Sequence, residues 1–287
     1  MTTGTAAPDL AAIKERQQKT WASGDYGTIA TTLVLIAEQL CETVDLHAGE
    51  RVLDVAAGSG NAALAAARRS CDVWATDYVP QLLERARERA AAERLTITFR
   101  EADAEALPFP DGSFDAILST LGVMFAPNQE RVAGELLRVC RPGGKIGLAN
   151  WTPEGFVGEM FRVIGRHVPP PAGVKPPPLW GTEPRLRELF GDAVSSLQVV
   201  RRHHPFRYRS PQHWLEAFRT FYGPMLKAFE GLDPSGQERL ASDLLELAQR
   251  FNQSGDETLV APGEYLDVVA IKNRAAGPDR DHPEDWR

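Results

Sequence analysis

One short segment decides the fold: Arg51-Val52-Leu53-Asp54-Val55-Ala56-Ala57-Gly58-Ser59-Gly60. Its first six residues are rich in β-formers and predict a strand, and the alanine-rich residues 61–69 that follow predict a helix. Between them, the glycines let the backbone approach a ligand, and the helix start offers unpaired amide groups. The segment therefore predicts a strand, a tight glycine turn and a helix, with a ligand site at the turn.

The glycine turn alone does not identify its ligand. Gly58-x-Gly60-x-x-Ala63 satisfies the relaxed pattern of nicotinamide dinucleotide sites, and Asp77 follows at about the expected distance. A plain strand–helix turn without a ligand has the same pattern. Three readings stay open at this point: a structural turn, a dinucleotide site and a site for another nucleoside cofactor.

The alternation of strands and helices continues to Trp151. We expect strands at 72–76, 95–100, 114–119 and 145–151, helices at 80–94 and 129–140, and a turn at 141–144. Strands that alternate with helices predict a mainly parallel sheet covered on both faces.

The sequence on either side of residues 51–151 does not continue this regular alternation of strands and helices. Helices are expected at 10–21 and 28–44 before it, and at 154–167 and 183–190 after it, around a proline-dense stretch at 168–178. Two further strands, 197–208 and 265–272, enclose helices at 212–230 and 235–253. The predicted organisation is N-terminal helices over 1–45, a main domain over 46–272 with a helical insert at about 209–258, and a disordered tail over 273–287.

Five motifs in order across residues 51–151 carry a family resemblance. They are Val52–Gly60, Ala75-Thr76-Asp77, Ala102–Phe109, Ser113–Ser119 and Leu137–Lys145. Together they resemble the class I S-adenosylmethionine-dependent methyltransferases, in particular the branch of the ubiquinone and menaquinone biosynthesis methyltransferases. The resemblance implies a Rossmann-like α/β fold with a seven-stranded, mostly parallel sheet, helices on both faces, an N-terminal helical lid and a helical insert before the last strand.

The resemblance also implies the cofactor, S-adenosylmethionine, with S-adenosylhomocysteine as product, and a role for several residues. Asp77 is expected to accept hydrogen bonds from both ribose hydroxyls. Asp103 is expected to accept the adenine amino group, and the Ala104 amide to meet an adenine ring nitrogen. Asp54 is expected at the amino-acid end of the cofactor, and the Ser119 backbone near its methionine portion. The full expected set is Tyr26, Asp54, Ala56, Gly58, Gly60, Asp77, Tyr78, Asp103, Ala104 and Ser119.

The chain departs from the family pattern at Ala56, where a glycine is common. A methyl group is tolerated there if the residue keeps a negative φ, and the substitution leaves only the exact path of the loop open. Tyr26, in the segment before the first strand, either covers the sheet edge or belongs to a lid over the cofactor.

The acceptor is expected to be a small molecule with an apolar or aromatic body. The expected lining of its pocket is Met124, Phe125, Trp151, Trp180 and Tyr222. No catalytic residue is assigned: His167, His203, His204 and His213 are candidate bases, but none lies in a motif. The arginines between Arg201 and Arg209 could bind an acidic substrate group.

Two other functions stay open. One is a nicotinamide-dependent oxidoreductase on the same glycine turn, although the chain has no obvious Tyr-x-x-x-Lys pair. The other is a non-catalytic module that binds adenosylmethionine.

Composition narrows the partners and the compartment. A net charge of −7 with a pI near 5.5 argues against a general nucleic-acid binder. The three cysteines show no metal or redox spacing, and no metal site is expected. The first 20 residues lack an apolar signal region, and no apolar run approaches the roughly 20 residues of a membrane span. We expect a cytoplasmic protein without nucleic-acid or membrane partners, and leave homo-oligomerisation open.

Overall fold

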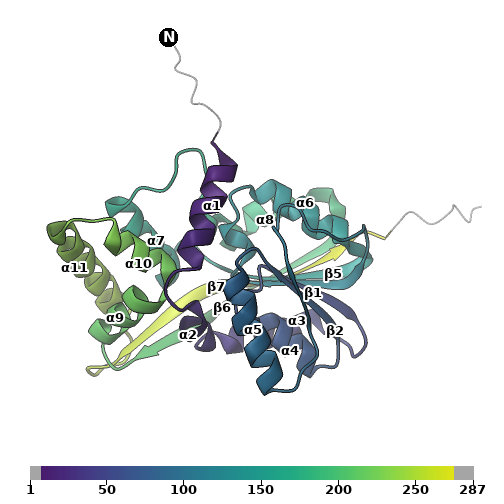
Figure 1. The fold of residues 1–287 in the computed structure, drawn as a ribbon, viewed down its shortest axis with the longest axis horizontal. Helices are drawn as coiled ribbons and strands as arrows, with labels where there is room; N and C mark the ends of the chain where they lie inside the picture. The colour runs from purple at the N-terminus through teal and green to yellow at the C-terminus, as the bar shows by residue number, and fades with distance from the viewer. Residues whose placement is uncertain (1–7, 275–287) are drawn as a thin grey trace, which may run out of the picture.

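A seven-stranded sheet forms the centre of the molecule (Figure 1), a computed structural model that describes residues 8–274. The strand order is β3-β2-β1-β4-β5-β7-β6. The strands are β1 (Arg51–Val55), β2 (Asp72–Asp77), β3 (Thr98–Glu101), β4 (Phe114–Thr120), β5 (Cys140–Trp151), β6 (Val194–Tyr208) and β7 (Leu259–Lys272). The first five pair in parallel, and β7 is antiparallel to both β5 and β6. The predicted Rossmann-like, mostly parallel sheet is confirmed.

Helices cover both faces of this sheet. They are α1 (Leu10–Trp21), α2 (Tyr26–Thr31), α3 (Val34–Val44), α4 (Asn61–Arg68), α5 (Pro80–Ala92), α6 (Gln129–Val139), α7 (Phe156–His167), α8 (Glu183–Phe190), α9 (Pro211–Phe221), α10 (Gly223–Glu230) and α11 (Pro234–Phe251). Figure 1 shows α3, α4 and α5 together on one side of the sheet, and α6 and α8 on the other. A Cβ atom at Gly147 of β5 would lie 2.3 Å from Val44 of α3, so the missing side chain is what lets this helix pack directly on the sheet.

The α7 and α9–α11 helices form a separate group beside the β6–β7 ribbon (Figure 1). They contain the predicted insert, which is α9–α11, between the last two strands. The strands on either side are longer than expected: β7 begins at Leu259 rather than at 265, because its first residues pair with the end of β6.

Two expected helices are each broken in two. The helix expected at 28–44 is interrupted at Thr32-Leu33, where the hydroxyls of Thr31 and Thr32 bond to the carbonyls of Thr28 and Ile29 and compete with the helical pattern. The helix expected at 212–230 is interrupted at Tyr222, which has φ −90° and ψ 103°. Pro224 explains the second break, because it has no N–H to donate to the Thr220 carbonyl and its ring would clash with that carbonyl in a continuous helix.

The turn expected at 141–144 lies inside β5, whose pairing with β4 shifts register there. Tail residues 275–287, expected to be disordered, lie outside the described part of the chain. Asn273, by contrast, is tied to the fold, because its amide donates to the Ala193 carbonyl at 3.0 Å.

The N-terminal segment connects the insert to the main domain. A β-bridge joins Gly24 to Tyr222. At Gly24, φ is +70° and a Cβ atom would lie 2.7 Å from the Phe221 carbonyl oxygen, so only glycine allows this approach. At Gly223 a Cβ atom would lie 2.1 Å from the Thr20 carbonyl oxygen. The segment that precedes β1 is therefore packed tightly against the α9–α10 junction.

Within residues 8–274, no helix combines the length and the apolar character that crossing a bilayer requires. The same residues contain no cluster of three or more histidine, cysteine or carboxylate side chains placed to hold a metal ion.

Candidate functional site

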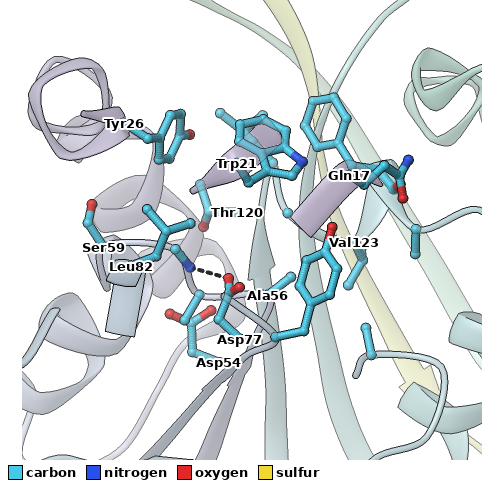
Figure 2. Close-up of a pocket in the computed structure, with 18 of the residues that line it drawn as sticks. Gln17, Trp21, Tyr26, Asp54, Ala56, Ser59, Asp77, Leu82, Thr120 and Val123 are labelled. Carbon is cyan, nitrogen blue, oxygen red and sulfur yellow. Dashed lines mark hydrogen bonds between the residues drawn. The ribbon is translucent and has the colours of Figure 1, made fainter. Parts of the chain in front are cut away.

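A cavity of about 890 Å³, open to solvent, lies at the carboxyl ends of β1, β2 and β4 (Figure 2). Helix α1 and the residues after it form its upper wall. The order β2-β1-β4 places the cavity where the sheet changes the direction of its connections, which is the usual ligand site of such sheets.

The glycine turn forms part of the cavity floor. Gly58 and Gly60 have φ of +55° and +84°, which glycine adopts without strain. A Cβ atom at Gly60 would lie 2.9 Å from the Ala86 Cβ atom, so this residue allows α5 to pack against the turn rather than lining the cavity. Gly58 lines the cavity and faces the Tyr26 ring.

Ala56 does not meet the condition under which its methyl group would be free of strain. Its φ is +53°, in the left-handed region, and not negative. A residue with a Cβ atom pays about 1–2 kcal/mol for this conformation. Ala56 therefore bears backbone strain at the start of the glycine turn.

Asp77, at the end of β2, is held by the turn that follows the neighbouring strand. Its Oδ2 accepts from the Gly58 amide at 2.8 Å (Figure 2), and its Oδ1 accepts from the Val79 amide at 2.9 Å. Burial raises the pKa of Asp77 to about 6. Each carboxylate oxygen can accept a further hydrogen bond, so the side chain can receive a pair of ligand hydroxyls without releasing the turn.

Three polar atoms buried along the cavity wall have no hydrogen-bond partner among residues 8–274: Asp54 Oδ1, Thr120 Oγ1 and Gln17 Oε1. Asp54 Oδ2 accepts from the Ala63 amide at 2.8 Å, and burial raises the pKa of this carboxyl to about 8. Gln17 Nε2 donates to the Phe125 carbonyl at 3.0 Å, which leaves its Oε1 as a bare acceptor. Buried polar atoms are almost always paired in folded proteins, so three unpaired atoms around one cavity indicate a polar ligand.

Asp103 and Ala104 also line the cavity, on the far side of β2. Asp103 Oδ1 accepts from the Glu105 amide at 2.9 Å. Its Oδ2 contacts Lys14 Nζ of α1 at 2.6 Å, and the same ammonium group contacts Glu105 Oε2 at 2.6 Å. Lys14 thereby ties α1 to the main domain across the cavity rim.

Aromatic side chains form the upper wall. Trp21 makes edge-on contacts with Tyr26, Phe125 and Tyr222, at ring-centroid distances of 5.4, 4.8 and 5.7 Å. Trp21, Tyr26 and Phe125 line the cavity, and Tyr222 lies behind them. Figure 2 shows Tyr26 and Trp21 above the carboxylates of Asp54 and Asp77. One wall of the cavity is therefore apolar and aromatic, and the floor is polar.

The Ser119 side chain is fully buried, and its hydroxyl donates to the Val55 carbonyl at 2.8 Å and accepts from the Val123 amide at 3.1 Å. The contact expected of Ser119 was with its backbone, which directly precedes the lining residue Thr120, and stays a prediction. Several residues expected at the acceptor pocket lie elsewhere. Trp151 packs against Phe206 and Tyr265, away from the cavity. Met124 and Trp180 are fully buried in the core and do not line the cavity either. Tyr78 does line it.

Several lining residues were not expected. They are Lys14, Gln17 and Trp21 on α1, Asn61 and Leu82 beside the glycine turn, and Thr120, Leu121, Gly122 and Val123 after β4. Positions 14, 17 and 21 share one face of a helix, which is a signal the sequence contains. That periodicity shows which residues face inward, but not that the face covers a cavity.

The candidate bases and the arginine cluster lie away from the cavity. None of the five histidines in the described residues lines it. His167 contacts Asp243 at 2.8 Å, and His203 contacts Glu264 at 3.4 Å. On β6, Arg201 pairs with Glu264, and Arg202 pairs with the buried Asp267. These arginines are occupied by partners on β7.

Comparisons with known proteins agree with this architecture. A family model described as a methyltransferase domain matches residues 53–148. An uncharacterized protein of Mycobacterium tuberculosis is 42% identical over 277 residues, which cover 95% of this chain and 100% of that protein. The demethylmenaquinone methyltransferase of Deinococcus radiodurans is 39% identical over 131 residues, which cover 44% of this chain and 54% of that enzyme.

Among solved structures, the YcgJ protein of Bacillus subtilis has the same fold. The TM-score is 0.59 at 19% identity, and the match covers 86% of this chain and 100% of that one. Fold, family model and sequence relatives agree, and the chain belongs to the class I S-adenosylmethionine-dependent methyltransferases.

Proposed function

We propose that this protein transfers the methyl group of S-adenosylmethionine to a small-molecule acceptor with an apolar or aromatic body. The observation that carries the proposal is the cavity itself, with unpartnered polar atoms on its floor and aromatic rings on its opposite wall. Such a cavity suits a polar nucleoside cofactor below and an apolar acceptor above.

The residues present fit the cofactor. Asp77 has free lone pairs for the two ribose hydroxyls, and Asp54 Oδ1 is a buried acceptor without a partner, suited to the ammonium group of the amino-acid end. Asp103 and Ala104 lie along the cavity where the family resemblance assigns adenine. Bound S-adenosylmethionine would supply an already activated methyl group.

The contribution of the protein is then to orient the acceptor and to exclude water. Helix α1 and the rings of Trp21, Tyr26 and Phe125 cover the cavity from above. Positioning and desolvation can account for most of the acceleration of such a transfer. No histidine lines the cavity among the described residues, so we propose that the acceptor does not depend on a histidine base.

The charged side chains along the cavity wall also limit the kind of acceptor molecule that fits. The one cationic side chain along the described cavity wall, Lys14, already contacts two carboxylates, which disfavours an anionic acceptor. We therefore propose an uncharged or cationic small molecule as the partner. A cytoplasmic location and the absence of nucleic-acid and membrane partners stay predictions, and homo-oligomerisation stays open.

Titration calorimetry with S-adenosylmethionine, S-adenosylhomocysteine and NAD tests the proposal. Wild-type protein is expected to bind the first two, and Asp77→Ala to bind them at least tenfold more weakly. Asp72→Ala is the matched control, because Asp72 opens the same strand at its other end and is 59% exposed. Transfer of a labelled methyl group to a compound in a metabolite extract would then identify the acceptor. Tight binding of NAD without binding of S-adenosylmethionine would overturn the proposal, and cofactor binding without transfer to any compound would point to a non-catalytic module.

A further inference from the structure

Left-handed backbone conformations at residues other than glycine fall into two groups. Five such residues occur in the described part of the chain. Asp45, Ser70 and Arg94 follow helices α3, α4 and α5, where a left-handed residue commonly ends a helix. Ala56 and Leu121 instead follow the neighbouring strands β1 and β4 directly, and both line the cavity.

Burial in the core compensates for the strained backbone conformation of Leu121, but not for that of Ala56. The Leu121 side chain is 4% exposed and belongs to the hydrophobic core, so its burial offsets the strain. Ala56 contributes one methyl group, and it is only partly buried. Strain that glycine would remove is retained only where the surroundings require the conformation, and such positions cluster at ligand sites.

The position of Ala56 is limited by a close backbone neighbour, Gly122. A Cβ atom at Gly122 would lie 2.2 Å from the Ala56 carbonyl oxygen and 2.8 Å from the Ala56 Cβ atom. The end of β4 therefore packs directly against Ala56, which cannot retreat from a ligand. The methyl group is a rigid part of the cavity floor.

The strand order indicates which part of a bound cofactor would lie nearest this methyl group. Strand β1 lies between β2, which ends at Asp77, and β4, which ends at Thr120. Figure 2 shows Asp77, Ala56 and Thr120 around the same part of the cavity. In the proposed binding mode, a cofactor with its ribose on Asp77 and its transferred group directed toward the β4 side would bring its sulfonium centre over the end of β1.

We propose that Ala56 is a specificity-determining residue that limits the size of the alkyl group on the cofactor's sulfur. This inference rests on the proposed function. Ala56 selects for a methyl substituent because a larger one would meet a side chain that has no room to move. A difference of one methylene group in a closely fitting site changes affinity by roughly 10–200-fold.

The test compares two cofactors that differ by one methylene group, S-adenosylmethionine and S-adenosylethionine. Dissociation constants are measured by titration calorimetry for the wild type, Ala56→Gly and Arg94→Gly. Arg94→Gly is the matched control, because it relieves the same kind of backbone strain at an exposed helix end. Both variants are expected to melt at or above the wild-type temperature.

The wild type is expected to favour S-adenosylmethionine at least about tenfold. Ala56→Gly is expected to reduce this ratio to about threefold or less, with Arg94→Gly unchanged. Ala56→Ser, which adds one atom, is expected to raise the ratio above that of the wild type. An unchanged ratio in Ala56→Gly, or equal affinity of the wild type for the two cofactors, would overturn this inference and leave the proposed function in place. Failure of the wild type to bind S-adenosylmethionine would overturn the proposed function and this inference with it.

Discussion

Replacing Lys14 by methionine tests whether one side chain fastens α1 over the cavity. The Lys14 ammonium group lies 2.6 Å from Asp103 Oδ2 and 2.6 Å from Glu105 Oε2. Burial alone would lower the pKa of Lys14, but the hydrogen bonds and charges of the two carboxylates outweigh it and raise the pKa above its usual value. The ammonium group is therefore charged throughout the neutral range. Methionine keeps the unbranched apolar stem of the side chain and removes the ammonium group.

The size of the effect follows from the exposure of the three side chains. Lys14 and Asp103 are 24% and 36% exposed, whereas Glu105 is 7% exposed. An exposed ion pair contributes about 0.2–1 kcal/mol, which describes the Asp103 contact. A hydrogen bond to a charged, buried group contributes about 1.5–3 kcal/mol, which describes the Glu105 contact. We expect the docking of α1 to lose about 2 kcal/mol, or roughly a 30-fold change in its opening equilibrium.

Hydrogen exchange followed by mass spectrometry measures this opening directly, because amides of a locally opened helix exchange faster. Lys19→Met is the matched control: Lys19 lies on the same helix, and it and its partner Glu15 are 72% and 66% exposed. The control is expected to change the exchange of α1 by about twofold or less. Equal exchange rates of α1 in the two variants would refute the reasoning, because the buried contact would then contribute no more than an exposed one.

Three further predictions concern stability and binding. Asp54→Asn is expected to gain stability relative to the wild type as the pH rises from 4 to 8. The pKa of the Asp54 carboxyl is about 8 in the folded protein and 3.8 ordinarily, so ionisation over this range stabilises the unfolded wild type. Thermal melts at several pH values measure the difference, and a difference that does not change with pH would contradict the prediction. Gly122→Ala would place a Cβ atom 2.2 Å from the Ala56 carbonyl oxygen and is expected to cost about 1–3 kcal/mol in urea denaturation, whereas Gly134→Ala, with nothing within 4 Å, should be neutral or stabilising. Tyr26→Ala is expected to weaken binding of S-adenosylhomocysteine about tenfold by loss of its ring from the cavity wall, and an unchanged dissociation constant by calorimetry would contradict a lid role.

The main domain was predictable because its signals are local. The β-rich run before Gly58, the glycine turn and the alanine-rich helix after it lie next to each other in the sequence, and the same holds for each later strand and helix. The helix breaks at Thr32 and Tyr222 depend on hydroxyl competition and on one proline, which periodicity does not register.

The cavity wall was only partly predictable, because it is built by contacts between distant residues. Lys14 meets Asp103 across 89 positions and Gln17 meets Phe125 across 108. No local pattern specifies such a contact. The left-handed conformation of Ala56 was also hidden, since the intrinsic preference of alanine is for negative φ and no local sequence pattern marks the exception.

The place of β7 between β5 and β6 has a consequence for the order of synthesis. Strand β6 has β7 as its single neighbour in the sheet, and β5 is bordered by β7 on one side. Among the described strands, β7 is the last to leave the ribosome. Until it arrives, β6 has no hydrogen-bonding partner in the sheet and one edge of β5 is bare, so a nascent chain presents two unpaired strands at once. Premature termination anywhere before Leu259 would thus leave β6 and the β7 side of β5 unpaired. Such a chain is expected to aggregate or to be degraded by proteases.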